Sequence, residues 1–445
     1  MSTEIRRAWM RDLVLPTALF SALGAMSWAV RGCSGYGSSM GCVFAGVLWG
    51  AAWWFIAREP GDVQSRRYTS GWIILAMTVG FGIAGGRGWA QWPNFFDGRL
   101  LTNAGKNEFE PISRAYGFLW LFIAGMPWAG IGACMLAWCG AERPSSAQRI
   151  AARWALRIAC GIAGVVVARQ LFDAYPEVFL PLYKSIVEKY QDLETNPNLR
   201  RIINDNRSAI SLMGLYLGFL AFEIGRRHWK NVTLIATVGM VNGIGWALLQ
   251  NWKWAPGLFK GVEFNWWRCW ESSGGISIGI AYGIAYFLVN REMPEAEKAT
   301  LETGWASDHP HLERLGAYLG LLLGLGLSLR NGLKGWANIY IGNEDYWSGI
   351  LWMVFGPLMI AALVWLLVRT FIRPGTAYFD DDAIPHAYGL MWLVLIVQNV
   401  CAQLVTGPKT TQAEIVFSIF YGVLFVATGG MIHYFHRLKK GGVGR

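Results

Sequence analysis

Apolar stretches long enough to cross a bilayer recur along almost the whole chain, and this pattern constrains the fold more than any other feature. A membrane-spanning helix needs about 20 mostly apolar residues. Only 15% of the 445 residues are charged, against about 25% in soluble domains. The sequence therefore predicts an all-α, polytopic membrane protein with about twelve transmembrane helices. They are expected at residues 13–31, 41–57, 71–88, 115–138, 152–171, 209–225, 232–250, 273–290, 314–330, 347–371, 387–405 and 414–435.

Basic residues concentrate in the short connections on one side of this predicted bundle. They precede the first stretch, follow the second, and stand between the sixth and the seventh: Arg6, Arg7, Arg11, Arg66, Arg67, Arg226 and Arg227. Cytoplasmic loops carry such an excess, so both termini are expected in the cytoplasm and the protein in a bacterial cytoplasmic membrane. The same rule explains the net charge of +10, and no nucleic-acid partner is expected.

An internal repeat divides the chain into two parts. Residues 80–91 and 324–338 each contain a Gly-x-Gly pair, then an arginine, then a Gly-Trp-Ala sequence. The fourth and tenth stretches each contain Gly-x-Leu-Trp followed by a proline, Pro127 or Pro357. A unit with an even number of spans begins on the same side each time, so the copies are parallel. The repeat predicts two six-helix bundles, at residues 1–230 and 231–445.

Twelve helices in two parallel halves, with both termini inside, resemble the major facilitator superfamily, whose halves are related by an axis along the membrane normal. Gly61, Asp62, Arg66 and Arg67 hint at the loop signature of that family. The resemblance implies that the first, fourth, seventh and tenth helices line a central cavity. Another membrane fold with six plus six helices is the alternative.

Polar and aromatic side chains inside the predicted spans are the candidates for solute binding. A charge inside a membrane is costly and by default marks a functional site. Arg31 ends the first span and has no charged counterpart in the second half. Tryptophans on the four helices that the resemblance places around the cavity could stack on a solute, and nearby amides could hydrogen-bond it. The predicted substrate-binding residues are Arg31, Trp28, Trp120, Asn242, Trp246, Gln250, Trp352, Gln398 and Asn399.

Four further charged residues near the ends of spans are expected to act in coupling or gating: Glu223, Glu271, Arg87 and Arg330. Arg87 and Arg330 occupy equivalent places in the repeat, which also fits a purely structural role. The seven cysteines show no metal-binding spacing, and no phosphate-binding glycine loop precedes a Lys-Ser or Lys-Thr pair. Neither a metal nor a cofactor is therefore expected.

These features predict a secondary transporter of a small polar solute, anionic or sugar-like, that works by alternating access between the two halves. Its expected partners are that solute and the lipid bilayer. The alternative is a membrane-embedded enzyme that acts on a lipid-linked substrate at the external face. Acidic residues of two predicted external loops would serve that reaction: Asp97, Glu108, Glu110, Glu263 and Glu271.

Overall fold

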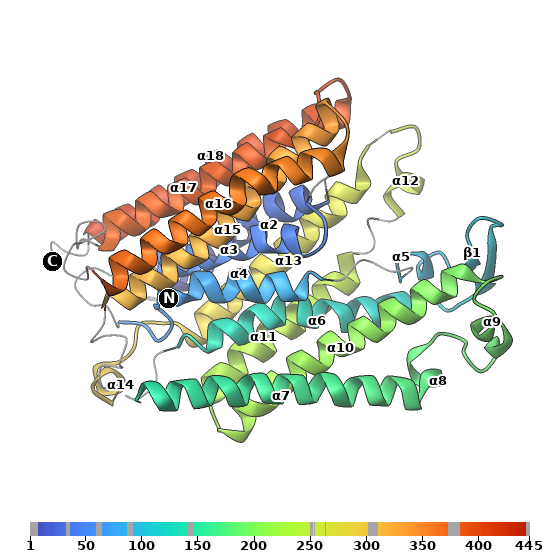
Figure 1. Ribbon diagram of the computed structural model, residues 1–445, viewed down its shortest axis with the longest axis horizontal. Helices are drawn as coiled ribbons and strands as arrows, with labels where there is room; N and C mark the ends of the chain where they lie inside the picture. Colours follow the sequence, from blue (N-terminus) through green and yellow to red (C-terminus); the bar gives the residue numbers. More distant parts are fainter. Residues whose placement is uncertain are drawn as a thin grey trace.

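The computed structural model describes residues 8–32, 36–58, 65–86, 92–140, 146–249, 252, 254–262, 264–300, 310–372 and 383–441. Within these residues the protein is a bundle of long helices with one two-stranded sheet at one end (Figure 1).

The long helices of the first part of the chain follow the predicted spans. A single π-turn, η1 (Met10–Val14), leads into α2. The helices at the predicted spans are α2 (Leu15–Arg31), α3 (Ser38–Ala57), the shorter α4 (Trp72–Ala84), α6 (Ala115–Ala137), α7 (Ala147–Ala174) and α10 (Pro197–Gly225). Shorter pieces lie between them: α5 (Trp92–Phe95), β1 (Arg99–Asn103), β2 (Glu108–Pro111), α8 (Pro176–Phe179) and α9 (Val187–Gln191).

The second part of the chain continues in the same way. Its long helices are α11 (Trp229–Leu249), α13 (Trp266–Val289), α15 (Pro310–Tyr340), α16 (Glu344–Phe371), α17 (Ala383–Leu404) and α18 (Gln412–Gly441). The short helices α12 (Ala255–Leu258) and α14 (Glu295–Thr300) lie between them.

Each predicted span coincides with one of these helices, and the protein is accordingly an all-α polytopic membrane protein. Among the described residues, eleven helices are long and apolar enough to cross a membrane. The remaining span corresponds to α4, whose helix has 13 residues and is shorter than a bilayer crossing needs. The spans predicted at 209–225 and 314–330 are longer in the structure, because polar turns extend α10 backwards to Pro197 and α15 forwards to Tyr340.

The bundle is layered (Figure 1). One side is formed by α7 and α10, which pack on each other, and the opposite side by α15, α16, α17 and α18. Between them lie α2, α3, α4, α6, α11 and α13. Because α2 packs most extensively on α13, the two predicted halves of the chain meet along this helix pair.

Glycines bring α2 and α13 into backbone contact. A methyl group placed on Gly275 would lie 1.9 Å from the carbonyl oxygen of Gly24, and one on Gly279 would lie 2.4 Å from the backbone of Ser21. Gly283 meets Thr17 in the same way one turn further on. Small residues spaced by four allow helices in a membrane to approach closely, so this seam is held by van der Waals packing.

The helices alternate in direction, so the ends of the described chain lie on one side. The Lys439 ammonium near the end of α18 donates to the carbonyl of Phe55 at the end of α3. Glu313, at the start of α15, accepts from the backbone amide of Gly71 before α4 at 2.7 Å. This side is the one that the distribution of basic residues predicts to be cytoplasmic.

The opposite end of the bundle carries a polar extension built from the β1–β2 hairpin, α5, α8, α9 and the first turns of α10 (Figure 1). The hairpin is held to α10 by a hydrogen bond from the Ala104 amide to Asn198, 2.7 Å long. Lys189 of α9 forms an ion pair with Glu110 of β2 at 2.5 Å. This extension lies on the predicted external side.

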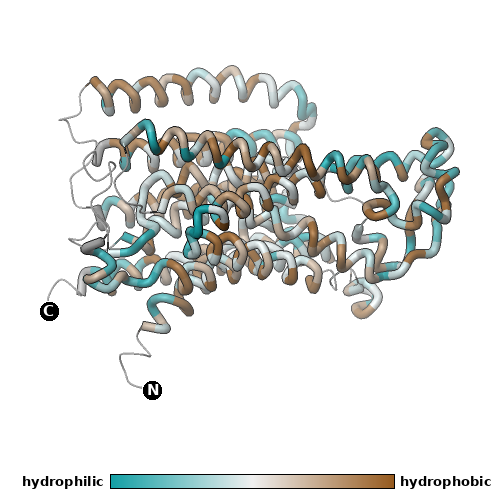
Figure 2. The backbone as a smooth tube through the Cα atoms, turned by 90° about the horizontal axis from the view of Figure 1, so that it is seen from below, coloured by the Kyte–Doolittle hydropathy of each residue, from teal (hydrophilic) through white to brown (hydrophobic). Residues whose placement is uncertain are grey.

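Large apolar side chains cover the outer surface. On α16 the exposed residues include Met353, Leu358 and Ile360, and on α7 they include Ile162 and Val167. Figure 2 shows hydrophobic residues running along the helices. Monomeric soluble proteins rarely expose apolar patches of this extent, whereas lipid accommodates them.

The two predicted copies of the repeat do not have equivalent surroundings. The fourth helix of the first copy, α6, is mostly buried, whereas its predicted counterpart α16 is mostly exposed and packs on α15. The division at residues 230 and 231 therefore stays a prediction.

Candidate functional site

A buried ion pair joins α2 to α13 near their predicted external ends. Nη1 of Arg31 lies 3.2 Å and 3.4 Å from the two carboxylate oxygens of Glu271. The side chains are only 5% and 1% exposed. Arg31 is the last residue of α2, where the helix dipole favours a cation. Because α13 begins at Trp266, Glu271 lies inside that helix rather than at its mouth.

Tryptophan rings surround this pair. The guanidinium carbon of Arg31 lies 4.7 Å from the ring centre of Trp128 and 5.3 Å from that of Trp28, within cation–π range. Trp246 packs on both rings, with centroids 5.5 Å from Trp128 and 6.4 Å from Trp28. These rings come from α2, α6 and α11. We call Arg31, Glu271, Trp28, Trp128 and Trp246 the indole cage.

The indole cage contains a buried polar group that has no hydrogen bond among the described residues. The indole nitrogen of Trp28 is buried and makes none. A buried donor left unsatisfied costs free energy, so this nitrogen is a ready donor for a polar ligand.

A column of aromatic side chains leads from the indole cage through the middle of the bundle. Consecutive ring centroids are 5.0 to 6.3 Å apart along Trp28, Trp49, Tyr282, Trp53 and Tyr286. The polar tips of the three middle rings donate to backbone carbonyls: Trp49 to Phe20, Trp53 to Tyr68 and Tyr282 to Ala129. Since these three groups are satisfied, the middle of the column is well suited to a packing role.

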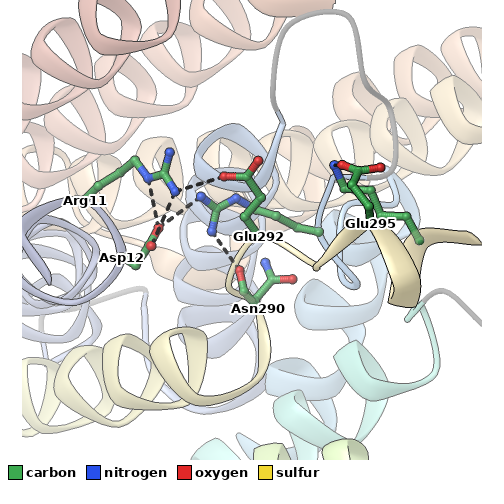
Figure 3. A network of polar contacts seen from close by, with 7 residues as sticks. Arg11, Asp12, Asn290, Glu292 and Glu295 are labelled. Atoms are coloured by element: carbon green, nitrogen blue, oxygen red, sulfur yellow. Dashed lines mark hydrogen bonds and ion pairs between the residues drawn. The ribbon is translucent and has the colours of Figure 1, made fainter. Parts of the chain in front are cut away.

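The column ends at a polar network on the predicted cytoplasmic side (Figure 3). Arg66, buried before α4, donates to the carboxylate of Asp12 at 3.0 Å and to the carbonyl of Asn290 at 2.8 Å. Arg11 contacts both Asp12 and Glu292. The network ties the start of α2 to the end of α13.

Further hydrogen bonds extend this network to α7. The Tyr68 amide donates to the side chain of Asn290 at 2.8 Å, and its hydroxyl donates to Asn231 at 2.6 Å. Asn231 in turn donates to Glu223 at 2.8 Å, and Glu223 accepts from Nε of Arg157 at 2.7 Å. Glu223, predicted to act in coupling or gating, thus lies in a fully buried ion pair far along the chain from Arg31.

A second ion-pair cluster covers the network at the surface. Glu297 of α14 accepts from Lys230 at 2.7 Å and from Arg67 at 3.0 Å. The hydrogen bond from Lys230 is the largest cause that lowers the pKa of the Glu297 carboxyl below its usual value, and Arg67 adds to it.

The three predicted amides that the structure describes each connect neighbouring helices. Asn242 of α11 donates to the carbonyl of Gly125 at 2.6 Å and accepts from Ser277 at 3.3 Å, beside the indole cage. Gln398 of α17 donates to the carbonyl of Leu23 at 3.0 Å. Asn399 donates to the carbonyl of Tyr421 at 3.2 Å, between α17 and α18.

Other predicted site residues lie elsewhere. Trp120 stacks on Trp92 near the polar extension, with centroids 5.9 Å apart. Trp352 is 42% exposed on α16, and the guanidinium of Arg330 lies 4.5 Å from its ring centre. Arg330 also donates to the Ser348 carbonyl at 3.0 Å, which ties α15 to α16. Arg87 and Gln250 lie outside the described residues.

Sequence reasoning missed several residues of the indole cage and of the polar network on the predicted cytoplasmic side. Trp128 follows the Pro127 that marked the repeat, and Asp12 stands between Arg11 and the first apolar stretch, where an acid at the start of a span was a usable signal. Asn290 and Tyr68 gave no signal, because only the fold brings them together.

Two of the acids expected for an enzyme form ion pairs with basic residues in the structure. Glu110 pairs with Lys189 and Glu271 with Arg31, while Glu263 lies outside the described residues. Within the part of the chain that the structure describes, no three His, Cys, Asp or Glu side chains are grouped as a metal site requires.

No family model, no curated protein and no solved structure matches this chain. The fold by itself defines the class, a polytopic helical membrane protein.

Proposed function

We propose that this protein is a secondary transporter that moves a small polar solute, anionic or sugar-like, by alternating access between residues 1–230 and 231–445. The proposal rests on one observation, the Arg31–Glu271 ion pair inside the indole cage. Its two members come one from each proposed half.

The cost of this ion pair supports a functional role. Buried ion pairs are often no more stabilising than apolar residues of the same size, and intramembrane charges commonly mark solute or ion pathways. The α2–α13 seam is already held by the contacts of Gly24 and Gly275. The ion pair is therefore not needed to hold the two helices together. A carrier, in contrast, needs a water-excluded site whose charged groups can exchange one partner for another.

The position of the polar contacts also fits alternating access. Among the polar contacts between the halves are Arg31–Glu271 near one predicted membrane face and Arg66–Asn290 near the other. In carriers built from two halves, contacts near the two faces form and break in alternation.

The proposal includes the helix arrangement that the resemblance to the major facilitator superfamily implies. The first, fourth and seventh helices, α2, α6 and α11, meet in the indole cage, which supports it. The tenth, α16, lies outside the cage with Trp352, so the site is proposed at the cage and does not include that residue.

The test is solute uptake by purified protein in liposomes, against neutral sugars, sugar acids and short monocarboxylates. We expect Arg31→Gln/Glu271→Gln, which removes both charges together, to abolish uptake. Arg169→Gln is the control, because Arg169 lies on the outer helix α7 and donates to Ser211. Uptake equal to that of empty liposomes for every solute, or unchanged in the double variant, would contradict the proposal.

A further inference from the structure

We propose that Arg330 binds the phosphodiester group of a phospholipid in the predicted external leaflet of the membrane. This lipid site lies between α15 and α16, two helices that contribute no residue to the indole cage, and it does not depend on the proposed transport. Two features of the ligand are recognised together: a negative charge carried by phosphate oxygens, and the apolar chains attached to the phosphate.

Arg330 differs from the other buried arginines in the charge that surrounds it. Four arginines are buried among the described residues, each 5% exposed or less. Three of them form ion pairs with carboxylates: Arg31 with Glu271, Arg66 with Asp12 and Arg157 with Glu223. Within the described ranges no carboxylate forms an ion pair with Arg330, and Glu344, at the start of α16, pairs with Lys334 at 2.6 Å. Because a buried charge without a counter-ion is unfavourable, an anion that reaches Arg330 stabilises the protein.

The hydrogen bonds of the Arg330 guanidinium leave part of it available. Nη1 donates to the side chain of Asn331 at 3.0 Å, and Nη2 donates to the carbonyl and the hydroxyl of Ser348. Nε is buried and makes no hydrogen bond among the described residues. A guanidinium has five N–H donors, of which these contacts can use three. Phosphate oxygens match the guanidinium in charge and geometry, so Nε donates to the lipid phosphate.

The surroundings of Arg330 favour a lipid as the source of the anion. The ring centre of Trp352 lies 4.5 Å from the guanidinium carbon, and this tryptophan is 42% exposed on the outward-facing helix α16. Its neighbour Met353 is 70% exposed, so acyl chains can pack beside the ring. The phosphate reaches Nε from this side when the Trp352 ring turns outward.

The depth of Arg330 in the membrane also fits a headgroup. Exposed aromatic residues follow on the same helix pair: Trp336, Tyr340 and Tyr346. Tryptophan and tyrosine gather at the level of the lipid headgroups, and Arg330 lies fewer than two helical turns from Trp336 along α15. Its guanidinium contacts Ser348 in the second turn of α16, towards the same end. The guanidinium therefore lies close to the region where phospholipid phosphates are found.

The test is native mass spectrometry of the purified protein titrated with phosphatidylglycerol, which resolves the binding of the first lipid. One hydrogen bond to a charged group changes a dissociation constant by about tenfold or more. We therefore expect Arg330→Gln to weaken the first binding step at least about tenfold, and Arg330→Lys, which keeps the charge, to weaken it less. Arg169→Gln is the control and should bind like the wild type, because Arg169 also lies near the predicted external face but is exposed on α7 and donates to Ser211.

A second measurement uses the wild type alone and so does not depend on the folding of a variant. Phosphatidylglycerol is compared with monogalactosyldiacylglycerol, which has similar chains and no phosphate, and with glycerophosphoglycerol, which is the headgroup without chains. We expect the first binding step to be clearly tightest for phosphatidylglycerol. Equal affinity for the galactolipid, or equal affinity for the soluble headgroup, would overturn the proposal. An unchanged first binding step in Arg330→Gln would overturn it as well.

Discussion

The contact between Gly24 and Gly275 makes a sharp prediction about stability. In Gly275→Ala the new methyl carbon would lie 1.9 Å from the Gly24 oxygen and 2.4 Å from its carbonyl carbon, whereas ordinary contacts begin near 3.4 Å. Both obstructing atoms belong to a helix backbone, so no side chain can turn aside. The helices must separate, and such overpacking costs about 1–3 kcal/mol or more. We expect a clearly lower midpoint of thermal unfolding in detergent.

Gly356→Ala is the matched control for this experiment. Gly356 lies within α16, and a methyl group there meets nothing within 4 Å. Alanine favours helix over glycine by up to about 1 kcal/mol, so this variant should be as stable as the wild type or more so. Equal midpoints for Gly275→Ala and Gly356→Ala would refute the close α2–α13 seam.

Three further predictions concern the predicted cytoplasmic side and the topology. Glu223→Gln should destabilise the fold by about 3–5 kcal/mol, because it leaves buried Arg157 without its carboxylate; a denaturation curve measures this. Glu297 has a lowered pKa, so its stabilising effect should be complete above pH 4.5 and fade as the pH falls further. Unfolding midpoints of wild type and Glu297→Gln should accordingly converge at acidic pH. In a background without native cysteines, an impermeant maleimide should label Leu258→Cys in intact cells, and Glu295→Cys only after permeabilisation.

The course of the helices was predictable, because the hydropathy pattern of a membrane helix is local. The start of α10 at Pro197 and the end of α15 at Tyr340 were not predictable in this way, since polar turns extend both helices. A window of apolar residues detects only the apolar part of a helix.

The site was predictable only in its parts. Arg31 and Glu271 both stood out as charges near apolar spans, but they are 240 residues apart, and no local pattern specifies that α2 packs on α13. Trp352 was grouped with Trp28 and Trp246 because the family resemblance implies that the tenth helix lines a cavity together with the first and the seventh. The structure separates them, since α16 faces outward. Helix packing depends on long-range shape complementarity, which a single sequence does not display.

The most direct test of the account is uptake of labelled solutes (a neutral sugar, glucuronate and lactate) into liposomes that contain the purified protein. The account predicts uptake of at least one of these solutes above the level in empty liposomes. Arg31→Gln/Glu271→Gln should abolish that uptake. Uptake no greater than in empty liposomes for every solute, or uptake unaffected by loss of the ion pair, would contradict it.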